Sequence, residues 1–207
     1  MFHSHSRRVP LKLASLFLAI SAVLSCGGHD SSSQQQNICD CQPEAPASAD
    51  FRHAEKHIPI PGKLGAPTTP LTVETILSWP QHETVVDGPR IGRETMVFQV
   101  NQAFLQWASV QEGDCDLHLE ISATPDKTAP RVMVETPVDS EYCTARQTLQ
   151  AQLKQHGVDL TITEGGEIPN PFPVGVRGMP FEDFEHNRGT ALIATTWELH
   201  PAIVTLQ

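Results

Sequence analysis

Residues that could bind a metal ion or transfer a proton recur at alternate positions in two short segments. The first segment carries Asp116, His118 and Glu120, which are separated by apolar residues. Alternate side chains of a β-strand point to opposite faces, so these three would share one face. Near the C-terminus, Glu198 and His200 stand two residues apart in the same way. The spacing therefore predicts carboxylates and imidazoles gathered on neighbouring strands.

A third segment, at residues 181–186, adds Asp183 and His186 to this set. We expect one metal-binding or polar cluster made of six residues: Asp116, His118, Asp183, His186, Glu198 and His200. Histidine together with carboxylate suits Zn²⁺, Mn²⁺ or Fe²⁺. Such an ion could activate water for the hydrolysis of a phosphodiester or another ester.

The same residue types allow two other interpretations. One histidine could act as a general base oriented by a carboxylate. Alternatively, the cluster could be a hydrogen-bonded network that serves the fold alone. The sequence assigns no catalytic residue and leaves open a metal-dependent hydrolase and a non-enzymatic binding or interaction module. We take the binding module as the first hypothesis, with Zn²⁺ or Mn²⁺ as the candidate cofactor.

Composition and motifs argue against several functional classes. The chain has 24 acidic and 14 basic residues and a formal net charge of −10, so general nucleic-acid binding is not expected. It contains no Gly-x-Ser-x-Gly motif and no Gly-x-x-x-x-Gly-Lys motif, which argues against a serine hydrolase and a P-loop nucleotide site. Trp79, Trp107 and Trp197 could stack on sugars, so oligosaccharide binding stays an alternative.

The N-terminal segment is typical of an exported lipoprotein. A basic leader precedes an apolar run at residues 11–24, which has the length of a signal h-region. The sequence Val-Leu-Ser-Cys-Gly at residues 23–27 has the form of a bacterial lipobox. We expect residues 1–25 to be the signal peptide and Cys26 to be diacylated (palmitate-type chains), which would anchor the protein to a membrane. Gly27 after the cysteine favours the outer membrane of a Gram-negative cell envelope. An ordinary secretory signal is the alternative.

Residues 26–69 are predicted to be a disordered tether, rich in serine, glutamine and proline. Its His53 and His57 stand four apart but have no third ligand nearby, so we expect both to be exposed to solvent. Residues 70–207 would form one domain.

Four cysteines besides Cys26 would meet an oxidising compartment, where disulfides are expected. We favour a Cys115–Cys143 disulfide, because both residues belong to the predicted domain. Cys39 and Cys41 could then close a small ring, pair with another chain, stay free or contribute to a zinc site.

The domain is predicted to be mainly β with one helix inserted after the third strand. We expect a short helix at 71–80, strands at 94–110, 116–123 and 131–135, and a helix at 145–156 that is capped by Asp139 or Ser140 and stopped by Gly157. Further strands are expected at 160–163, 174–176 and 192–206, and a loop at 180–190 connects the last two. This order fits a five-stranded OB-like barrel, and an α+β sandwich is the alternative.

Four motifs in this order resemble a group of bacterial proteins of unassigned function that have an OB-like, nuclease-type barrel. The motifs are Glu112–Leu119, Glu135–Pro137 with Cys143, Phe181–His186 and Glu198–Pro201. The resemblance covers roughly residues 71–204 and implies the fold but no activity. Cys115 stands where the pattern has glycine, so the turn is in doubt unless a disulfide from Cys115 fixes it, and Glu182 replaces an aromatic residue.

Overall fold

The computed structural model describes residues 39, 51–61, 68–82, 87–111, 113–160, 165–184 and 190–207. All of them belong to the compact unit that spans residues 31–207. The predicted signal peptide, the predicted lipidation site Cys26, Cys41 and His186 lie outside the described residues. Within the described ranges, no helix has the length and apolar character needed to cross a membrane.

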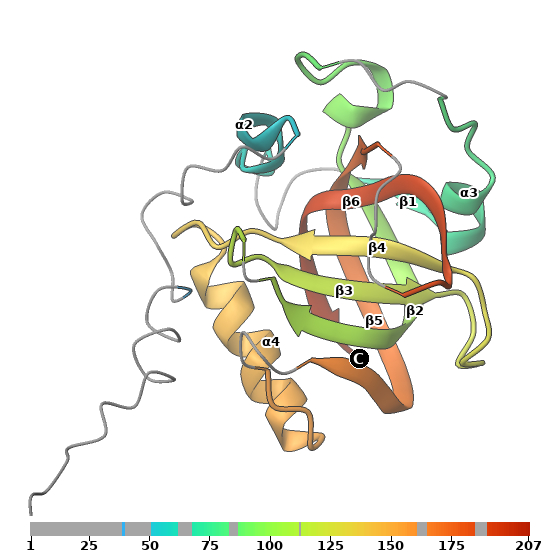
Figure 1. The fold of residues 1–207 in the computed structure, drawn as a ribbon, viewed down its shortest axis with the longest axis vertical. Helices are drawn as coiled ribbons and strands as arrows, with labels where there is room; N and C mark the ends of the chain where they lie inside the picture. Colours follow the sequence, from blue (N-terminus) through green and yellow to red (C-terminus); the bar gives the residue numbers. More distant parts are fainter. Residues whose placement is uncertain are drawn as a thin grey trace, which may run out of the picture. The chain divides into compact units, whose positions relative to one another are not determined.

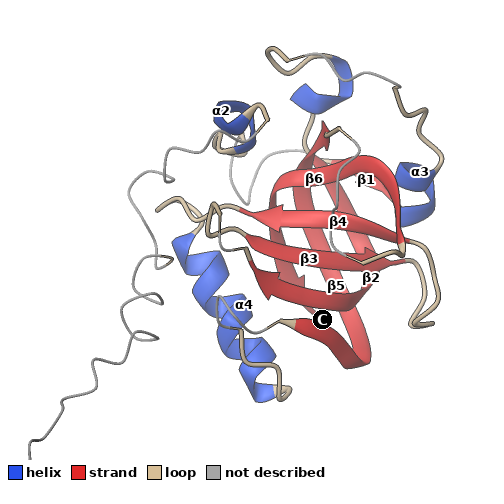
Figure 2. Cartoon of the chain, in the orientation of Figure 1, coloured by secondary structure: helices blue, strands red, loops and turns tan. Residues whose placement is uncertain are grey.

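Five strands form the closed barrel that the sequence predicts (Figures 1 and 2). They are β2 (Phe98–Val110), β3 (Leu117–Ser122), β4 (Arg131–Thr136), β5 (Gly166–Glu182) and β6 (Ile193–Leu206). The order is β2-β3-β4-β6-β5, and pairing of β5 with β2 closes it. This is the topology of a small five-stranded barrel of the OB type. A short strand, β1 (Thr69–Leu71), adds to β2 in parallel.

The apolar side chains that fill the barrel follow the strand period. In β3, Leu117, Leu119 and Ile121 are fully buried at alternate positions. The facing core positions on β4 are Val132 and Val134, which are also fully buried. The other face of these strands is covered as well, so the polar side chains between the leucines are enclosed rather than left in water.

The main helix, α4 (Cys143–Gln155), follows β4 and precedes β5, as expected. Leu149 and Leu153, one turn apart, are its buried apolar residues, and it packs against β6. Gly157 follows the C-cap residue His156, and its φ of +80° is the left-handed geometry that glycine adopts without cost. The N-cap position of α4 is Tyr142, so the predicted caps Asp139 and Ser140 are wrong by two or three residues.

Two smaller helices precede the barrel. Helix α3 (Val73–Leu77) begins at Thr72, whose hydroxyl accepts from the backbone N–H of Thr75, as expected of an N-cap. The 3₁₀ helix η2 (Gly92–Thr95) occupies the start of the predicted strand at 94–110. The predicted short strand at 174–176 belongs to the much longer β5, which extends through Glu182 into the predicted loop because it pairs with β6 along most of its length.

Part of the predicted tether is ordered and buried. Residues 51–61 include helix α2 (His53–Lys56) and contact the barrel domain. Arg52 forms two 2.8 Å hydrogen bonds with Glu94, and Ile60 donates its backbone N–H to the Tyr142 hydroxyl. The prediction of a disordered tether is therefore corrected for this segment, because long-range polar contacts hold it.

The predicted Cys115–Cys143 disulfide is wrong. Cys115 is bonded to Cys39, 76 residues earlier in the sequence, and Cys143 takes part in a different disulfide. The prediction places Cys39 in the disordered tether, away from the domain. Instead Cys39 is buried against the barrel, with its Cα 4.9 Å from that of Cys115.

Candidate metal centre

Four of the six predicted cluster residues come together, one does not, and one is outside the described residues. Asp116 precedes β3, His118 lies on β3, and Glu198 and His200 lie on β6. Asp183, just after β5, is instead paired with Lys56 of α2 at 3.1 Å. His186 is outside the described residues.

Strand register explains how these residues meet. In the β3–β4 pair, His118 stands opposite Glu135, and in the β4–β6 pair Met133 stands opposite Glu198. Strand β4 therefore lies between the two predicted segments and adds Glu135 to the site. The Glu135 carboxylate joins the two histidines, with Oε1 3.1 Å from Nε2 of His118 and Oε2 2.7 Å from Nδ1 of His200.

Three ligand atoms converge at the centre of this cluster: His57 Nε2, Asp116 Oδ2 and His200 Nε2, all within 4.8 Å of one another. Asp116 Oδ2 lies 3.2 Å from His200 Nε2 and 3.6 Å from His57 Nε2. The side chains of Asp116 and His200 are 0% exposed, and that of His57 is 7% exposed.

None of these three atoms makes a hydrogen bond to a described residue. Asp116 Oδ2 and His200 Nε2 lie 3.2 Å apart, an ion-pair contact when His200 is protonated, and the Asp116 carboxylate helps to raise the pKa of His200. Buried polar atoms are nearly always hydrogen-bonded, and leaving even one of them unsatisfied costs about 1–3 kcal/mol. Three such atoms that face one another could hold a metal ion.

The opposite side of each ligand is held by a second polar group. Nδ1 of His57 is 2.7 Å from Oδ2 of Asp139, and Nδ1 of His200 is 2.7 Å from Glu135. Asp116 accepts the backbone N–H of Val138 at Oδ1, over 2.8 Å. Carboxylates on the far nitrogen of metal-binding histidines fix the tautomer and raise the basicity of the ligand. The site has this second layer on both histidines.

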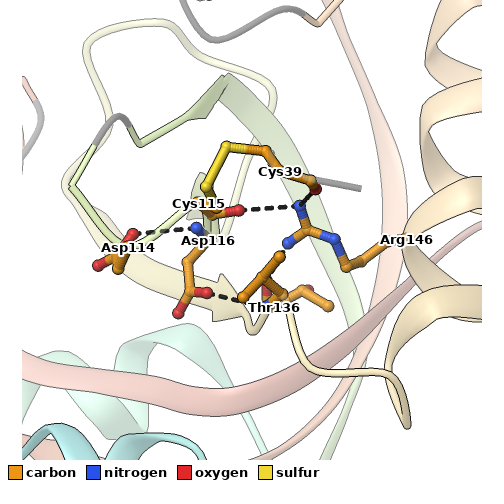
Figure 3. Close-up of a disulfide and its surroundings, with 7 residues drawn as sticks. Cys39, Asp114, Cys115, Asp116, Thr136 and Arg146 are labelled. Carbon is orange, nitrogen blue, oxygen red and sulfur yellow. Dashed lines mark hydrogen bonds between the residues drawn. A yellow bond between two sulfur atoms is a disulfide. The ribbon is translucent and has the colours of Figure 1, made fainter. Parts of the chain in front are cut away.

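The turn that presents Asp116 is fixed by the disulfide (Figure 3). Cys115 has a φ of +67°, a left-handed conformation that costs a non-glycine residue about 1–2 kcal/mol. This agrees with the expectation that the position suits glycine and that a disulfide offsets the loss, although the partner is Cys39. Arg146 of α4 donates to the Cys115 carbonyl at 2.8 Å, and Asp114 Oδ1 accepts the N–H of Asp116 at 2.9 Å.

The electrostatics of the cluster call for positive charge. Burial alone would lower the pKa of His200, but the charge of Glu135 and the neighbouring carboxylates of Asp116 and Glu198 raise it well above its usual range. Burial would likewise raise the pKa of Glu135, and the charges of His118 and His200 bring it well below its usual range. Three buried carboxylates, those of Asp116, Glu135 and Glu198, surround one imidazole here, so further positive charge, from Lys56, His118 or a bound cation, would stabilise the cluster.

A second group of possible ligands, Glu135, Glu198 and His200, lies on the other side of the same imidazole. There the Nδ1 nitrogen of His200 is already matched by Glu135 at 2.7 Å and Glu198 at 3.3 Å. This side is therefore suited to orient His200, while the side facing His57 and Asp116 is suited to hold an ion.

Sequence reasoning missed three residues of the site: His57, Glu135 and Asp139. The prediction that His57 is exposed is wrong, because Asp139 and the barrel enclose it. A partial signal for Glu135 was present: the predicted turn at residues 125–127 contains the centre of the observed β3–β4 pairing, which places Glu135 opposite His118. No local signal marks His57 or Asp139 as partners, since they are 82 residues apart.

Comparisons of the chain with protein-family models, with curated proteins and with solved structures give no match. The function is therefore inferred from the chemistry of the site itself.

Proposed function

We propose that this protein is a cell-envelope lipoprotein that binds one divalent transition-metal ion, Zn²⁺ or Mn²⁺, on His57, Asp116 and His200. A single observation carries the proposal: three buried ligand atoms converge without a hydrogen-bond partner among the described residues. The lipobox at Cys26 supports the envelope location and the membrane as a partner.

The donor set favours zinc. Two imidazole nitrogens and one carboxylate oxygen are ligands that Zn²⁺ accepts, and a water molecule would complete a tetrahedron. The ion would replace the proton that His200 otherwise retains, and it would help to balance the three carboxylates around this imidazole. Asp139 and Glu135 would keep both histidines in the tautomer that presents Nε2 to the ion.

Burial favours metal binding without hydrolysis. A hydrolase needs room for a phosphodiester beside the metal-bound water, but Asp116 and His200 are wholly buried and His57 nearly so. Three protein ligands do leave one coordination position for water, as in catalytic zinc sites. A metal-dependent hydrolase therefore stays the second hypothesis, and the enclosed geometry places it behind a binding role.

The test measures metal content and affinity in a Cys26→Ser chain, which cannot be lipidated and is otherwise complete. The protein is stripped with a chelator, reloaded with Zn²⁺ or Mn²⁺, desalted and measured by inductively coupled plasma mass spectrometry. We expect one equivalent of metal in the parent and substantially less in the His57→Ala and His200→Ala variants. His156→Ala is the matched control, because His156 is an exposed histidine at the end of α4.

Circular dichroism of each variant separates ligand loss from unfolding. His57→Ala carries the most weight, since His57 lies outside the barrel strands and its loss should leave the barrel intact. A folded parent that retains neither ion would refute the proposal. So would a His57→Ala variant that retains a full equivalent of metal with unchanged affinity.

A further inference from the structure

A pocket of about 390 Å³ lies apart from the metal ligands. Its walls come from residues 89 and 91–94, from Glu182 at the end of β5 and from Trp197 of β6. Arg52, Pro80 and His82 complete the lining. None of the three proposed metal ligands contributes to it, so this pocket can be considered independently of the metal.

Arg93 dominates the chemistry of this pocket. Its guanidinium carbon lies 4.4 Å from the ring centroid of Trp79 and 4.9 Å from that of Trp197. The two indoles meet edge to face, with centroids 5.3 Å apart, and they hold the guanidinium in place. Nη1 of Arg93 is buried and donates to no described residue. Arg93 is thus a preorganised donor with unused hydrogen-bonding capacity.

The other charged residues of the lining are already paired with one another. Arg52 and Glu94 form a two-point ion pair at the pocket wall. Glu182 accepts the backbone N–H of His82 at 2.8 Å and contacts the His82 ring. Among the basic lining residues that the structure describes, only Arg93 has no carboxylate within ion-pair distance, although the chain carries an excess of acidic residues. Its charge is therefore available to an anion from outside.

The pocket also offers apolar surface. Ile91 on its rim is 74% exposed, the most exposed of the large apolar side chains described. Pro80 and Pro89 add further apolar lining, and Trp197 is the largest side chain in the wall. An exposed isoleucine beside an unpaired guanidinium matches a ligand that has an apolar body and one anionic group.

We propose that this pocket binds a small organic acid, with its carboxylate on Arg93 and its apolar part against Ile91 and Trp197. The planar guanidinium accommodates a carboxylate through two parallel hydrogen bonds. The indoles behind it keep the side chain extended, so little conformational entropy is lost when the acid binds.

The experiment compares benzoate with benzamide, a neutral molecule of nearly the same shape, on the metal-loaded and metal-free Cys26→Ser chain. Binding is followed by tryptophan fluorescence and by the indole N–H resonance of Trp197 in NMR spectra. We expect saturable benzoate binding that is at least about tenfold tighter than benzamide binding, the value of one charge-assisted hydrogen bond. Arg93→Gln should remove this preference.

Lys127→Gln is the matched control, because Lys127 is an exposed basic residue that does not line the pocket. It removes one positive charge and should leave the preference for benzoate unchanged. Thermal unfolding shows whether Arg93→Gln is folded, and Arg93→Lys, which keeps the charge but loses the planar fork, should bind benzoate more weakly than the parent.

Three outcomes would overturn the proposal: no saturable binding of benzoate, equal affinity for benzoate and benzamide, or an unchanged preference in folded Arg93→Gln. The metal content of the chain bears on none of them. If the folded chain retains neither Zn²⁺ nor Mn²⁺ after reloading but still prefers benzoate, the proposed function fails while the proposal for this pocket stands.

Discussion

The carboxylate behind His57 gives the sharpest test of the metal site. Asp139 lies outside the proposed ligand set, yet its Oδ2 is 2.7 Å from Nδ1 of His57. It can affect the ion only by orienting the His57 ring and raising its basicity. Asp139→Asn keeps an oxygen that accepts the Nδ1–H and loses the negative charge, whereas Asp139→Ala loses both.

These differences predict a graded loss of affinity. Replacing the carboxylate behind a metal-binding histidine weakens metal binding by about 10–100-fold. We expect Asp139→Asn at the lower end, about 1.4 kcal/mol, and Asp139→Ala at the upper end, about 2.7 kcal/mol. Asp139 is partly exposed, at 13%, so screening by solvent keeps the expected effect within this range.

The assay is competition for Zn²⁺ against a chromophoric chelator at fixed pH, with the metal-free unfolding temperature of each variant measured in parallel. A smaller loss of Zn²⁺ affinity in Asp139→Asn than in Asp139→Ala, at similar unfolding temperatures, would support the role of Asp139 in orienting His57. Equal affinity in the parent and Asp139→Ala would refute the reasoning, and so would a loss of affinity fully explained by unfolding.

Three further predictions concern the frame around the site. Replacing Cys39 and Cys115 together by serine should lower the free energy of unfolding by about 4 kcal/mol in urea titrations, because the disulfide closes a loop of 76 residues; a change below 1 kcal/mol would contradict this. Burial would raise the pKa of Glu94, but hydrogen bonds from Arg52 and from the backbone lower it in the folded protein. The Glu94 carboxylate therefore stabilises the fold fully above its pKa in the unfolded chain, and this stabilisation is lost as the pH falls through the lower pKa of the folded protein. Glu94→Gln should lower the free energy of unfolding by about 3–5 kcal/mol at neutral pH and make that free energy depend less on pH in the acidic range. An unchanged pH dependence in the acidic range would refute this role of Glu94. Gly178→Ala should lower the free energy of unfolding by about 1–3 kcal/mol in thermal unfolding, because the added Cβ would lie 2.8 Å from a side chain of β6. An unchanged unfolding temperature would show that β6 moves to accommodate the added methyl group.

The barrel was predictable because its strands follow local rules. Leu117, Leu119 and Ile121 alternate with polar residues, and this alternation places β3 and its buried face. Gly157 marks the end of α4 for a reason that holds in any fold, its left-handed backbone. The order of three strands, one helix and two strands then leaves few ways to close a barrel.

The candidate site was only partly predictable, because register decides which polar residues meet. Strand alternation places polar residues on one face of each segment, and in the structure Asp116 and Glu198 contact His200, while His118 reaches His200 through Glu135. The residue that links the two histidines, Glu135, required the register of the β3–β4 hairpin. Asp183 has the right chemistry, but it meets Lys56, a partner from a segment 127 residues away in sequence.

That N-terminal segment shows where composition misleads. Prolines around residues 51–61 indicate an extended chain, and an extended chain can still be buried if distant residues bind it. Here Glu94 holds Arg52, Asp183 holds Lys56, and the Tyr142 hydroxyl donates to the carbonyl of Ile58. Such contacts leave no local pattern in the sequence.

The consequence for the site is that its three proposed ligands come from three separate parts of the chain. His57 follows α2, Asp116 stands at a turn fixed by a disulfide, and His200 belongs to the last strand. The contact of His57 Nδ1 with Asp139 helps to hold residues 51–61 on the barrel, but it leaves the Nε2 atom, which faces Asp116 and His200, without a hydrogen bond to a described residue. An ion needs it, since Asp116 and His200 alone supply two ligands. The position of His57 is therefore a stronger argument for a metal site than the strand residues that first suggested one.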